Sequence, residues 1–455
     1  MPTAKDVGSV VHVFVQVKFM LKKYAIVGTG SRAEQYIEGV SWTHRDVAEM
    51  VAFCDTNQTR MDFWNRERVS RWGLQPVPTY KACEFDRMIA EQRPDIVIVT
   101  SIDRTHHIYI CRAMELGCDV ITEKPMTIDA EKCQQIIDTQ KRTGRKLTVT
   151  FNCRYMPKNV KVKEVLRSGI VGEITSVHFE WLLDTSHGAD YFRRWHRNKV
   201  NSGGLLVHKA THHFDLINWW IESKPVIVFA MGDLKFYGKA NAEKRGVTEF
   251  YSRSRNNPIA QKDPFALHVT EDRHRQLYYD AEHEDGYFRD QSVFGDGIDI
   301  EDNMGVMVRY ANNVVMTYSL NAHSPWEGYR VCFNGTKGRL EVNVVETSFV
   351  DAGQEIAAYD GMKEIQRERK DWLPMIVFQP HWGKPLEMPF DEVSLAAHSG
   401  GDPLLLKDVL VGVEDDLLGR AADFHDGANS ILVGIGANIS MKTGLPVKVQ
   451  DLIHW

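Results

Sequence analysis

The stretch Tyr24-Ala25-Ile26-Val27-Gly28-Thr29-Gly30-Ser31-Arg32-Ala33 decides the fold of this chain. Its four-residue apolar run from position 24 has the composition of a buried parallel strand. Two glycines break the run, and residues 34–40 follow with a helical pattern. The order strand, glycine turn, helix is typical of the first unit of a doubly wound sheet.

The glycine turn also predicts a ligand. In the pattern Gly28-x-Gly30-x-x-Ala33, glycines after a strand let the backbone approach a pyrophosphate at a helix N-terminus, although a tight βα turn explains the same residues. Asp55 ends a second apolar run, residues 49–54. A carboxylate there accepts hydrogen bonds from a ribose and repels a 2′-phosphate. We therefore predict NAD rather than NADP, with Arg60 as the one nearby cation that could pair with the extra phosphate.

Strand and helix patterns continue to alternate through the first third of the chain. Three apolar runs predict strands at residues 96–99, 119–122 and 146–151. Two further segments predict helices at residues 108–116 and 130–143. This alternation predicts an N-terminal, doubly wound parallel sheet in residues 21–150.

The remaining residues, 151–455, have a different pattern. Six segments alternate as antiparallel strands do, at residues 174–183, 226–234, 303–310, 314–321, 329–334 and 338–344. A polar stretch, residues 236–300, interrupts them, and we interpret it as a loop insertion near the site or at an interface. We therefore predict an α/β chain whose C-terminal α+β domain contains a large, mostly antiparallel open sheet.

Composition excludes several classes of function. The chain has 455 residues, with 55 Lys and Arg against 61 Asp and Glu, so no basic face for nucleic acid is expected. No apolar run approaches the roughly 20 residues that span a membrane. The seven cysteines contain no C-x-x-C pair, which argues against disulfides and zinc thiolates. We expect a cytoplasmic protein, with residues 1–20 as an N-terminal extension that forms an extra strand or precedes a start at Met20.

Three further motifs accompany the glycine turn: Glu123-Lys124-Pro125, Arg154-Tyr155-Met156-Pro157, and His208-Lys209-Ala210-Thr211-His212-His213-Phe214-Asp215. From about Met20 to its end, the chain with these motifs resembles the Gfo/Idh/MocA oxidoreductases. The resemblance implies a Rossmann domain, then an α/β domain whose open sheet often mediates oligomers. It also implies a small-molecule sugar, glycoside or polyol substrate and a homo-oligomer, dimer or tetramer, formed through the C-terminal sheet.

The resemblance, together with Asp55, assigns the site residues. The expected cofactor contacts are Gly28, Thr29, Gly30, Ser31, Arg32, Ala33, Asp55, Thr100, Ser101, His106, Glu123, Lys124, Pro125 and Asn152. Pro125 shapes its turn, often through a cis peptide bond. The expected substrate contacts are Lys124, Arg154, Tyr155, Asp190, Tyr191, Arg193, Trp195, His196, His208 and His212. A second candidate wall is His398-Ser399-Gly400-Gly401-Asp402, and Tyr287, Arg289, Asp290 and His323 are further candidates.

Oxidation of an alcohol needs a base for the hydroxyl proton and a cation for the oxygen. We assign the proton to His212 and the oxygen to Lys124, although the two can exchange roles. His208 stands where the family commonly has Asp, and Asp215 is placed to orient an imidazole. A metal on the histidine pair is not expected, because Lys209 replaces the glutamate of H-E-x-x-H.

Two other functions fit the same motifs. One is a redox-neutral glycosidase that uses tightly held NAD to form a transient keto-sugar. The other is a non-catalytic nucleotide-binding sensor, for which the missing Asp at position 208 is the only indication. Net NADH formation separates the dehydrogenase from both.

Overall fold

The computed structural model describes residues 21–269, 271–350, 375–390, 400–413 and 415–455. The predicted N-terminal extension and the candidate wall residues His398 and Ser399 lie outside these ranges.

A parallel sheet of six strands forms the N-terminal part of the chain, in the order β3-β2-β1-β4-β5-β6. The strands are β1 (Lys22–Val27), β2 (Ala48–Asp55), β3 (Thr79–Lys81), β4 (Ile96–Val99), β5 (Asp119–Thr122) and β6 (Leu147–Val149). The strand order reverses between β1 and β4, which is where doubly wound sheets bind ligands. The predicted doubly wound sheet is confirmed.

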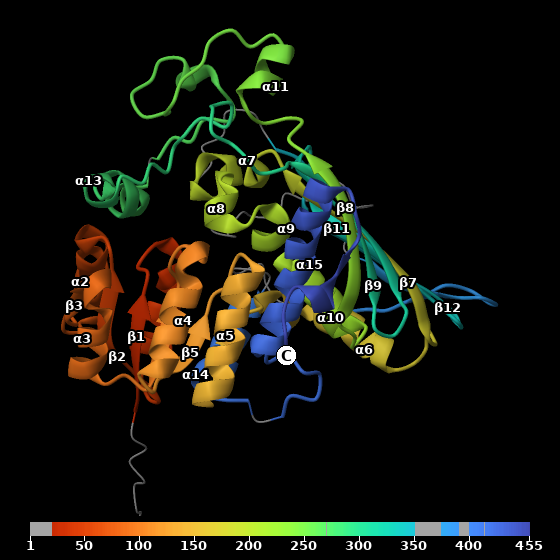
Figure 1. The fold of residues 1–455 in the computed structure, drawn as a ribbon, viewed down its shortest axis with the longest axis horizontal. Helices are drawn as coiled ribbons and strands as arrows, with labels where there is room; N and C mark the ends of the chain where they lie inside the picture. The colour runs from red at the N-terminus through yellow and green to blue at the C-terminus, as the bar shows by residue number, and fades with distance from the viewer. Residues whose placement is uncertain (1–20, 270, 351–374, 391–399, 414) are drawn as a thin grey trace, which may run out of the picture.

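Helices cover both faces of this sheet (Figure 1). Alternate residues of β1 enter different cores: Tyr24 and Ile26 pack with one cluster, and Ala25 and Val27 with the other. On the first side lie α1 (Glu34–Glu38) and α2 (Gln58–Trp72), and on the second lie α3 (Phe85–Gln92), α4 (His106–Glu115) and α5 (Ala130–Thr143). Burial on both sides explains why the strands are apolar throughout rather than alternating.

A mixed sheet of nine strands dominates the rest, in the order β14-β13-β12-β11-β7-β10-β9-β8-β15. The strands are β7 (Ile174–Asp184), β8 (Pro225–Asp233), β9 (Asn303–Tyr310), β10 (Val315–Ser324), β11 (Glu327–Gly335), β12 (Gly338–Thr347), β13 (Met375–Pro380), β14 (Leu386–Glu387) and β15 (Val447–Lys448). Only β10 and β7 pair in parallel. The prediction of a large, mostly antiparallel sheet is therefore confirmed.

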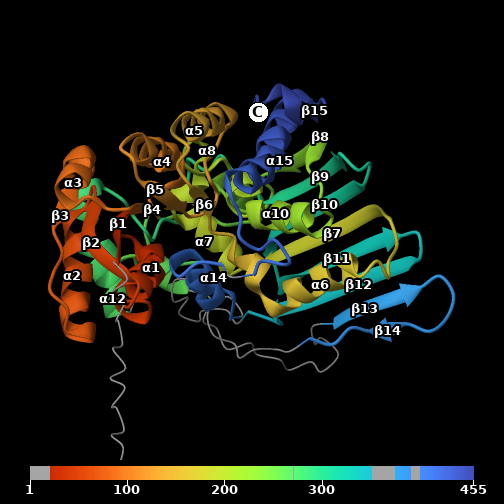
Figure 2. The same ribbon diagram turned by 90° about the horizontal axis from the view of Figure 1, so that it is seen from below.

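Helices cover one face of the large sheet. Figure 2 shows α6 (Pro157–Arg167), α10 (Thr211–Trp220) and α15 (Phe424–Thr443) against it. In β9, exposed and buried residues alternate without interruption, as expected for a strand with one solvated face. This open face stays the predicted surface for oligomer formation. None of the described helices is both long and apolar enough to cross a membrane.

The insertion, residues 236–300, lies between β8 and β9. The structure adds short helices to this segment, which we interpreted as a loop: α11 (Lys239–Lys244), η7 (Ala260–Lys262), α12 (Asp272–His274), η8 (Arg275–Tyr279) and α13 (Glu282–Asp285). It leaves the large sheet and returns to the N-terminal domain, where α13 lies over the end of α2 (Figure 1). The insertion and the first turn of α2, which are far apart in the sequence, thus meet beside the C-terminal ends of the parallel strands.

Candidate active site

A cavity of about 700 Å³ lies where the parallel sheet meets the C-terminal half. It opens at the ends of β1 and β4, the position that the strand order predicts for a ligand. The predicted residues that line it are Gly28, Gly30, Ser31, Arg32, Asp55, Thr100, Ser101, His106, Glu123, Lys124, Asn152, Tyr191, Trp195, His196, His208, His212, Tyr287 and Asp402. Thirteen other predicted residues, among those the structure describes, do not line it: Thr29, Ala33, Pro125, Arg154, Tyr155, Asp190, Arg193, Asp215, Arg289, Asp290, His323, Gly400 and Gly401.

The glycine turn packs closely against the end of β4. Gly28 has a φ of +91°, and a Cβ there would lie 2.4 Å from the Ser101 amide nitrogen, so only glycine fits. A Cβ on Gly30 would meet no atom within 4 Å. The amide and hydroxyl of Thr29 donate to Asp55 Oδ2 at 2.5 and 2.7 Å, which fixes the turn to the end of β2. Open space beside Gly30 and an acceptor at Asp55 fit a dinucleotide.

The Glu123 carboxylate lines the cavity and binds side chains in and after the glycine turn. It accepts hydrogen bonds from Arg32 Nε and the Tyr36 hydroxyl, both at 2.7 Å. Burial raises the pKa of Glu123, but Arg32, Lys124 and the Tyr36 hydrogen bond together more than offset this, and the pKa is lowered overall. Nearby, Asn152 Nδ2 donates to Asp402 Oδ1 at 2.8 Å. Glu123 is thus an ionised group that aligns Arg32 at the cavity.

His106 positions the turn that carries Lys124. Its two ring nitrogens lie 2.8 Å from the Pro125 carbonyl oxygen and 2.9 Å from that of Ser101. Burial lowers the pKa of His106. The Lys124–Pro125 peptide bond is cis, as the resemblance implied. His106 therefore connects the ends of β4 and β5 in the cavity wall.

Lys124 projects toward the C-terminal half. Its Nζ donates to the carbonyl oxygen of His208 at 3.3 Å. Burial is the largest influence and lowers the pKa of Lys124 to about 8; Glu123 and Asp103 oppose this shift, and Lys209 adds to it. With a pKa of about 8, about a tenth of the Lys124 amine is uncharged at pH 7 and able to accept a proton.

Asp103 is a site residue that the sequence reasoning missed. Its Oδ2 lies 2.5 Å from His208 Nδ1, and both side chains line the cavity. Burial raises the pKa of Asp103 and lowers that of His208, so the two favour their uncharged forms. A carboxyl group of the N-terminal domain thus contacts the His208 ring in the cavity. The position of Asp103, two residues after Ser101, was the only available signal.

Histidines and aromatic rings form the opposite wall. His212 on α10 is 8% exposed, and its ring centroid lies 6.0 Å from that of Phe151. His187, also missed by the sequence reasoning, lies 2.7 Å from Glu327 Oε1 and 2.9 Å from the Tyr191 hydroxyl. This wall offers both ring faces and hydrogen-bonding groups, the combination that recognises sugars.

Lys209 adds a cation that the sequence reasoning mentioned only for what it excludes. Its Nζ lies 5.2 Å from the centre of the Trp181 ring, which stacks between His213 at 3.9 Å and Tyr329 at 4.8 Å. Lys209 lines the cavity, and no carboxylate of the described residues forms an ion pair with it.

Arg154 and Asp215 differ from their predicted roles. Asp215 accepts from Arg154 Nε at 2.8 Å and from Nη2 at 2.6 Å, and both side chains are buried outside the cavity. Asp215 thus orients no imidazole, because it lies on the face of α10 that packs against η5 (Asn152–Tyr155), the turn that carries Arg154. Tyr155 is 1% exposed, with the Arg420 guanidinium 5.2 Å from its ring centre.

Asp190 and Arg193 lie behind the cavity wall rather than in it. Asp190 accepts two hydrogen bonds from Arg289, at 2.7 and 3.0 Å, and also pairs with Arg193 and Arg194, each at 3.2 Å. These cations outweigh burial and lower the pKa of Asp190. The cluster supports the lining residues Tyr191 and Arg194. Two other candidates lie elsewhere: Asp290 pairs with Arg253, and His323 stacks on Phe236.

Among the described residues, no group of three or more His, Cys, Asp and Glu side chains is arranged to hold a metal ion.

Family comparison covers nearly the whole chain. The "Oxidoreductase family, NAD-binding Rossmann fold" model matches residues 22–151, and the "Oxidoreductase family, C-terminal alpha/beta domain" model matches residues 163–449. The chain therefore belongs to the Gfo/Idh/MocA family. It is an oxidoreductase with an NAD-binding Rossmann domain.

Relatives agree with this membership. A Bacillus subtilis (strain 168) protein named as an oxidoreductase, YteT, is 34% identical over 403 residues, which cover 84% of this chain and 87% of the relative. The D-glucoside 3-dehydrogenase of Escherichia coli (strain K12) is 28% identical over 42% of this chain and 52% of its own length. The solved aldose-aldose oxidoreductase of Caulobacter crescentus shares the fold, with a TM-score of 0.60 and 17% identity over 94% of this chain and all of that one.

The two glycines of the turn predict different effects of one added methyl group. Gly28→Ala should lower the free energy of unfolding by more than about 2 kcal/mol, because alanine disfavours positive φ and its Cβ would also overlap the Ser101 backbone. Gly30→Ala should leave stability within about 0.5 kcal/mol. It should weaken NADH binding about tenfold or more, because the methyl takes space that the pyrophosphate needs. Urea unfolding and NADH fluorescence titration measure both. Wild-type NADH affinity in Gly30→Ala would argue against this cofactor position.

The buried Arg154–Asp215 pair predicts a second result. Asp215→Ala should destabilise the protein by about 3–5 kcal/mol, because it leaves the buried Arg154 charge without its bidentate partner. The double variant Arg154→Met/Asp215→Leu should lose less, since no charge then stays buried. Equal loss in the single and double variants, measured by urea unfolding, would contradict a structural role for the pair.

Proposed function

We propose that this oxidoreductase removes a hydride from a hydroxyl-bearing carbon of a sugar, glycoside or polyol, and that Lys124 and His212 handle the hydroxyl proton. One observation carries the proposal. Lys124 of the Rossmann domain lies in the same cavity as His208 and His212 of the C-terminal half, beside the glycine turn. A reaction between a cofactor and a second molecule needs this arrangement.

In this proposal Lys124 is the proton acceptor. Its burial lowers its pKa to about 8, so the neutral amine is accessible near the pH of the cell. When bound, NAD supplies the hydride acceptor. His212 holds the substrate hydroxyl oxygen while the hydroxyl proton moves to Lys124 Nζ. The His208 carbonyl accepts a hydrogen bond from Nζ and so keeps that nitrogen in place. The sequence suggested His212 for the proton and Lys124 for the oxygen, so this assignment exchanges their roles.

Charge in the cavity refines the substrate class. Trp195 and Tyr191 offer ring faces for the apolar C–H surface of a sugar, and Lys209 offers a cation over the Trp181 ring. A sugar carrying a carboxylate would pair with this ammonium group. Sugar acids therefore belong in any substrate panel beside neutral glucosides, galactosides, hexoses and inositols.

Of the alternatives, the redox-neutral glycosidase uses the same residues and differs in net NADH formation. The non-catalytic sensor is disfavoured, because a protein without chemistry needs no lysine of lowered pKa beside two histidines.

The direct test is absorbance of reduced nicotinamide with NAD and the sugar panel. One sugar class should produce NADH, and Lys124→Met should reduce kcat by about 100-fold or more, the usual contribution of a positioned base. Lys141→Met, at the exposed end of α5, is the matched control and should retain activity. Sugar release from aryl glycosides without NADH would favour the glycosidase, and no reaction of any kind would favour the sensor.

The pH dependence tests the base itself. With Lys124 as proton acceptor, kcat for oxidation should rise with pH and level off above about 8, because the neutral amine is then the dominant form. Lys209→Met should move this transition to higher pH, since the Lys209 charge helps to lower the pKa of Lys124. A kcat that falls as pH rises through 8 would instead make Lys124 the required cation and His212 the base.

A further inference from the structure

Part of the insertion lines the cavity beside the glycine turn and Asp55, which we call the cofactor half of the cavity. We propose that residues 271–290, the docked segment, are a third wall of the NAD site that retains the cofactor between turnovers. Four of its residues line the cavity together with Gly30 and Asp55: Arg273, Tyr278, Asp285 and Tyr287. The inference needs only NAD binding and goes beyond the proposed reaction.

Glu284 fastens the docked segment to the first turn of α2. Its carboxylate accepts hydrogen bonds at 2.7 Å from the Gln58 amide, the Thr59 amide and the Thr59 hydroxyl, and pairs with Lys81 at 2.8 Å. Burial raises the pKa of Glu284, but these donors outweigh it and lower that pKa to about 2. The carboxylate is therefore ionised at every physiological pH, and its bonds are charge-assisted.

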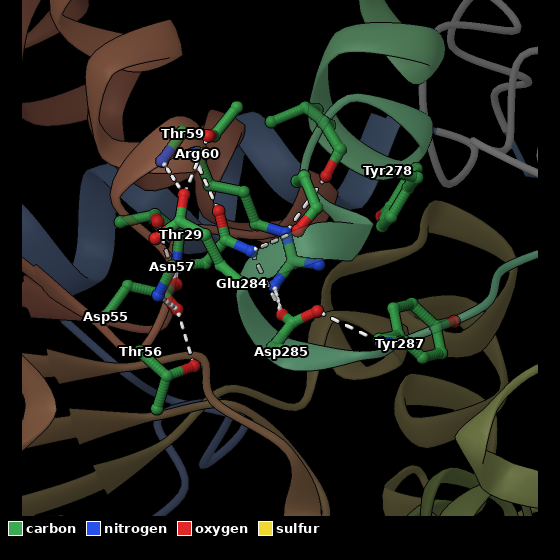
Figure 3. Close-up of polar contacts among 12 residues, drawn as sticks. Thr29, Asp55, Thr56, Asn57, Thr59, Arg60, Tyr278, Glu284, Asp285 and Tyr287 are labelled. Atoms are coloured by element: carbon green, nitrogen blue, oxygen red, sulfur yellow. Dashed lines mark hydrogen bonds and ion pairs between the residues drawn. The ribbon is translucent and has the colours of Figure 1, made fainter.

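A second connection runs from Asp55 through Asn57 to the docked segment (Figure 3). Asp55 Oδ1 accepts from the Asn57 amide at 3.0 Å. The Asn57 side chain donates to the Ala281 carbonyl at 2.8 Å and to Asp285 Oδ2 at 3.2 Å. The residue expected to hold the cofactor ribose and the docked segment thus share one hydrogen-bond network.

Arg60 closes this network. Its Nη1 pairs with Asp285 at 2.6 Å, and its Nε donates to the Leu277 carbonyl at 2.9 Å. Its guanidinium lies 5.9 Å from the Tyr278 ring centre and 6.0 Å from that of Tyr287. Two of the three Arg60 nitrogens are thereby engaged by the docked segment, which leaves only Nη2 for a 2′-phosphate and supports NAD over NADP.

Apolar packing adds to these bonds. Leu277 is fully buried with Phe63 and Trp64 of α2 in the core of the Rossmann domain. The Tyr278 hydroxyl accepts from the Ser31 amide at 3.3 Å, within the glycine turn itself. The docked segment therefore reaches the place where a pyrophosphate would be held.

The other end of the segment is fixed to the C-terminal half. Arg289 pairs bidentately with Asp190, and Asp290 with Arg253. The segment consequently spans the cofactor half of the cavity with attachments on both sides. A dinucleotide bound against Gly30 and Asp55 would leave only after some of these contacts break.

The experiment compares NADH dissociation from the full-length wild type and from Glu284→Gln/Asp285→Asn by stopped-flow fluorescence. The isosteric double variant should release NADH about 10-fold to 100-fold faster, because it removes charge-assisted bonds. It should also bind NADPH better relative to NADH, since Arg60 is freed. Asp280→Asn is the matched control, because Asp280 in the same segment pairs only with the exposed Arg275.

Hydrogen exchange of the wild type supplies a measurement that depends on no variant. Bound NADH should slow amide exchange in residues 271–290 and at Thr59 and Arg60. Wild-type NADH release from the double variant would overturn the inference, and so would exchange in the docked segment that NADH leaves unchanged. Neither readout uses a sugar, so each holds even if the proposed reaction is wrong.

Discussion

This site depends on the hydrogen bonds that the Asp55 carboxylate accepts. One oxygen holds the glycine turn through Thr29, and the other holds Asn57, which contacts the insertion. Because one buried carboxylate binds both the glycine turn and the residue that contacts the insertion, the positions of the turn and of the insertion depend on each other. The N-terminal sheet supplies the glycine turn, helices of the C-terminal half supply the histidine wall, and the insertion spans the space beside them.

This dependence bears on the two enzymatic alternatives. A dehydrogenase exchanges its cofactor at every turnover, whereas a redox-neutral enzyme needs no exchange. A docked segment with attachments on both sides of the cavity slows exchange, which suits a reaction that returns the hydride. The proton transfer that we propose for Lys124 is needed in either case.

The sequence was sufficient wherever local signals determine structure. β4 and β5 are short apolar runs, and the predicted helix at 130–143 is reproduced as α5, between the N-cap Asp129 and Gly144 at its end. In contrast, α2 was missed, because its mostly polar sequence is buried partly by the insertion. Contacts between distant residues were equally out of reach: Asp103 meets His208 across 105 positions, and Asp215 turns to Arg154 rather than to a histidine.

The most direct measurement follows the hydride itself. A responsive sugar deuterated at its hydroxyl-bearing carbons would be incubated with NAD, and the nicotinamide examined by mass spectrometry. Deuterium should appear on the nicotinamide ring with the wild type, and none should be transferred by Lys124→Met. If the wild type accumulates the oxidised, carbonyl form of the sugar while the nicotinamide gains no deuterium, the chemistry at Lys124 is not hydride transfer to NAD.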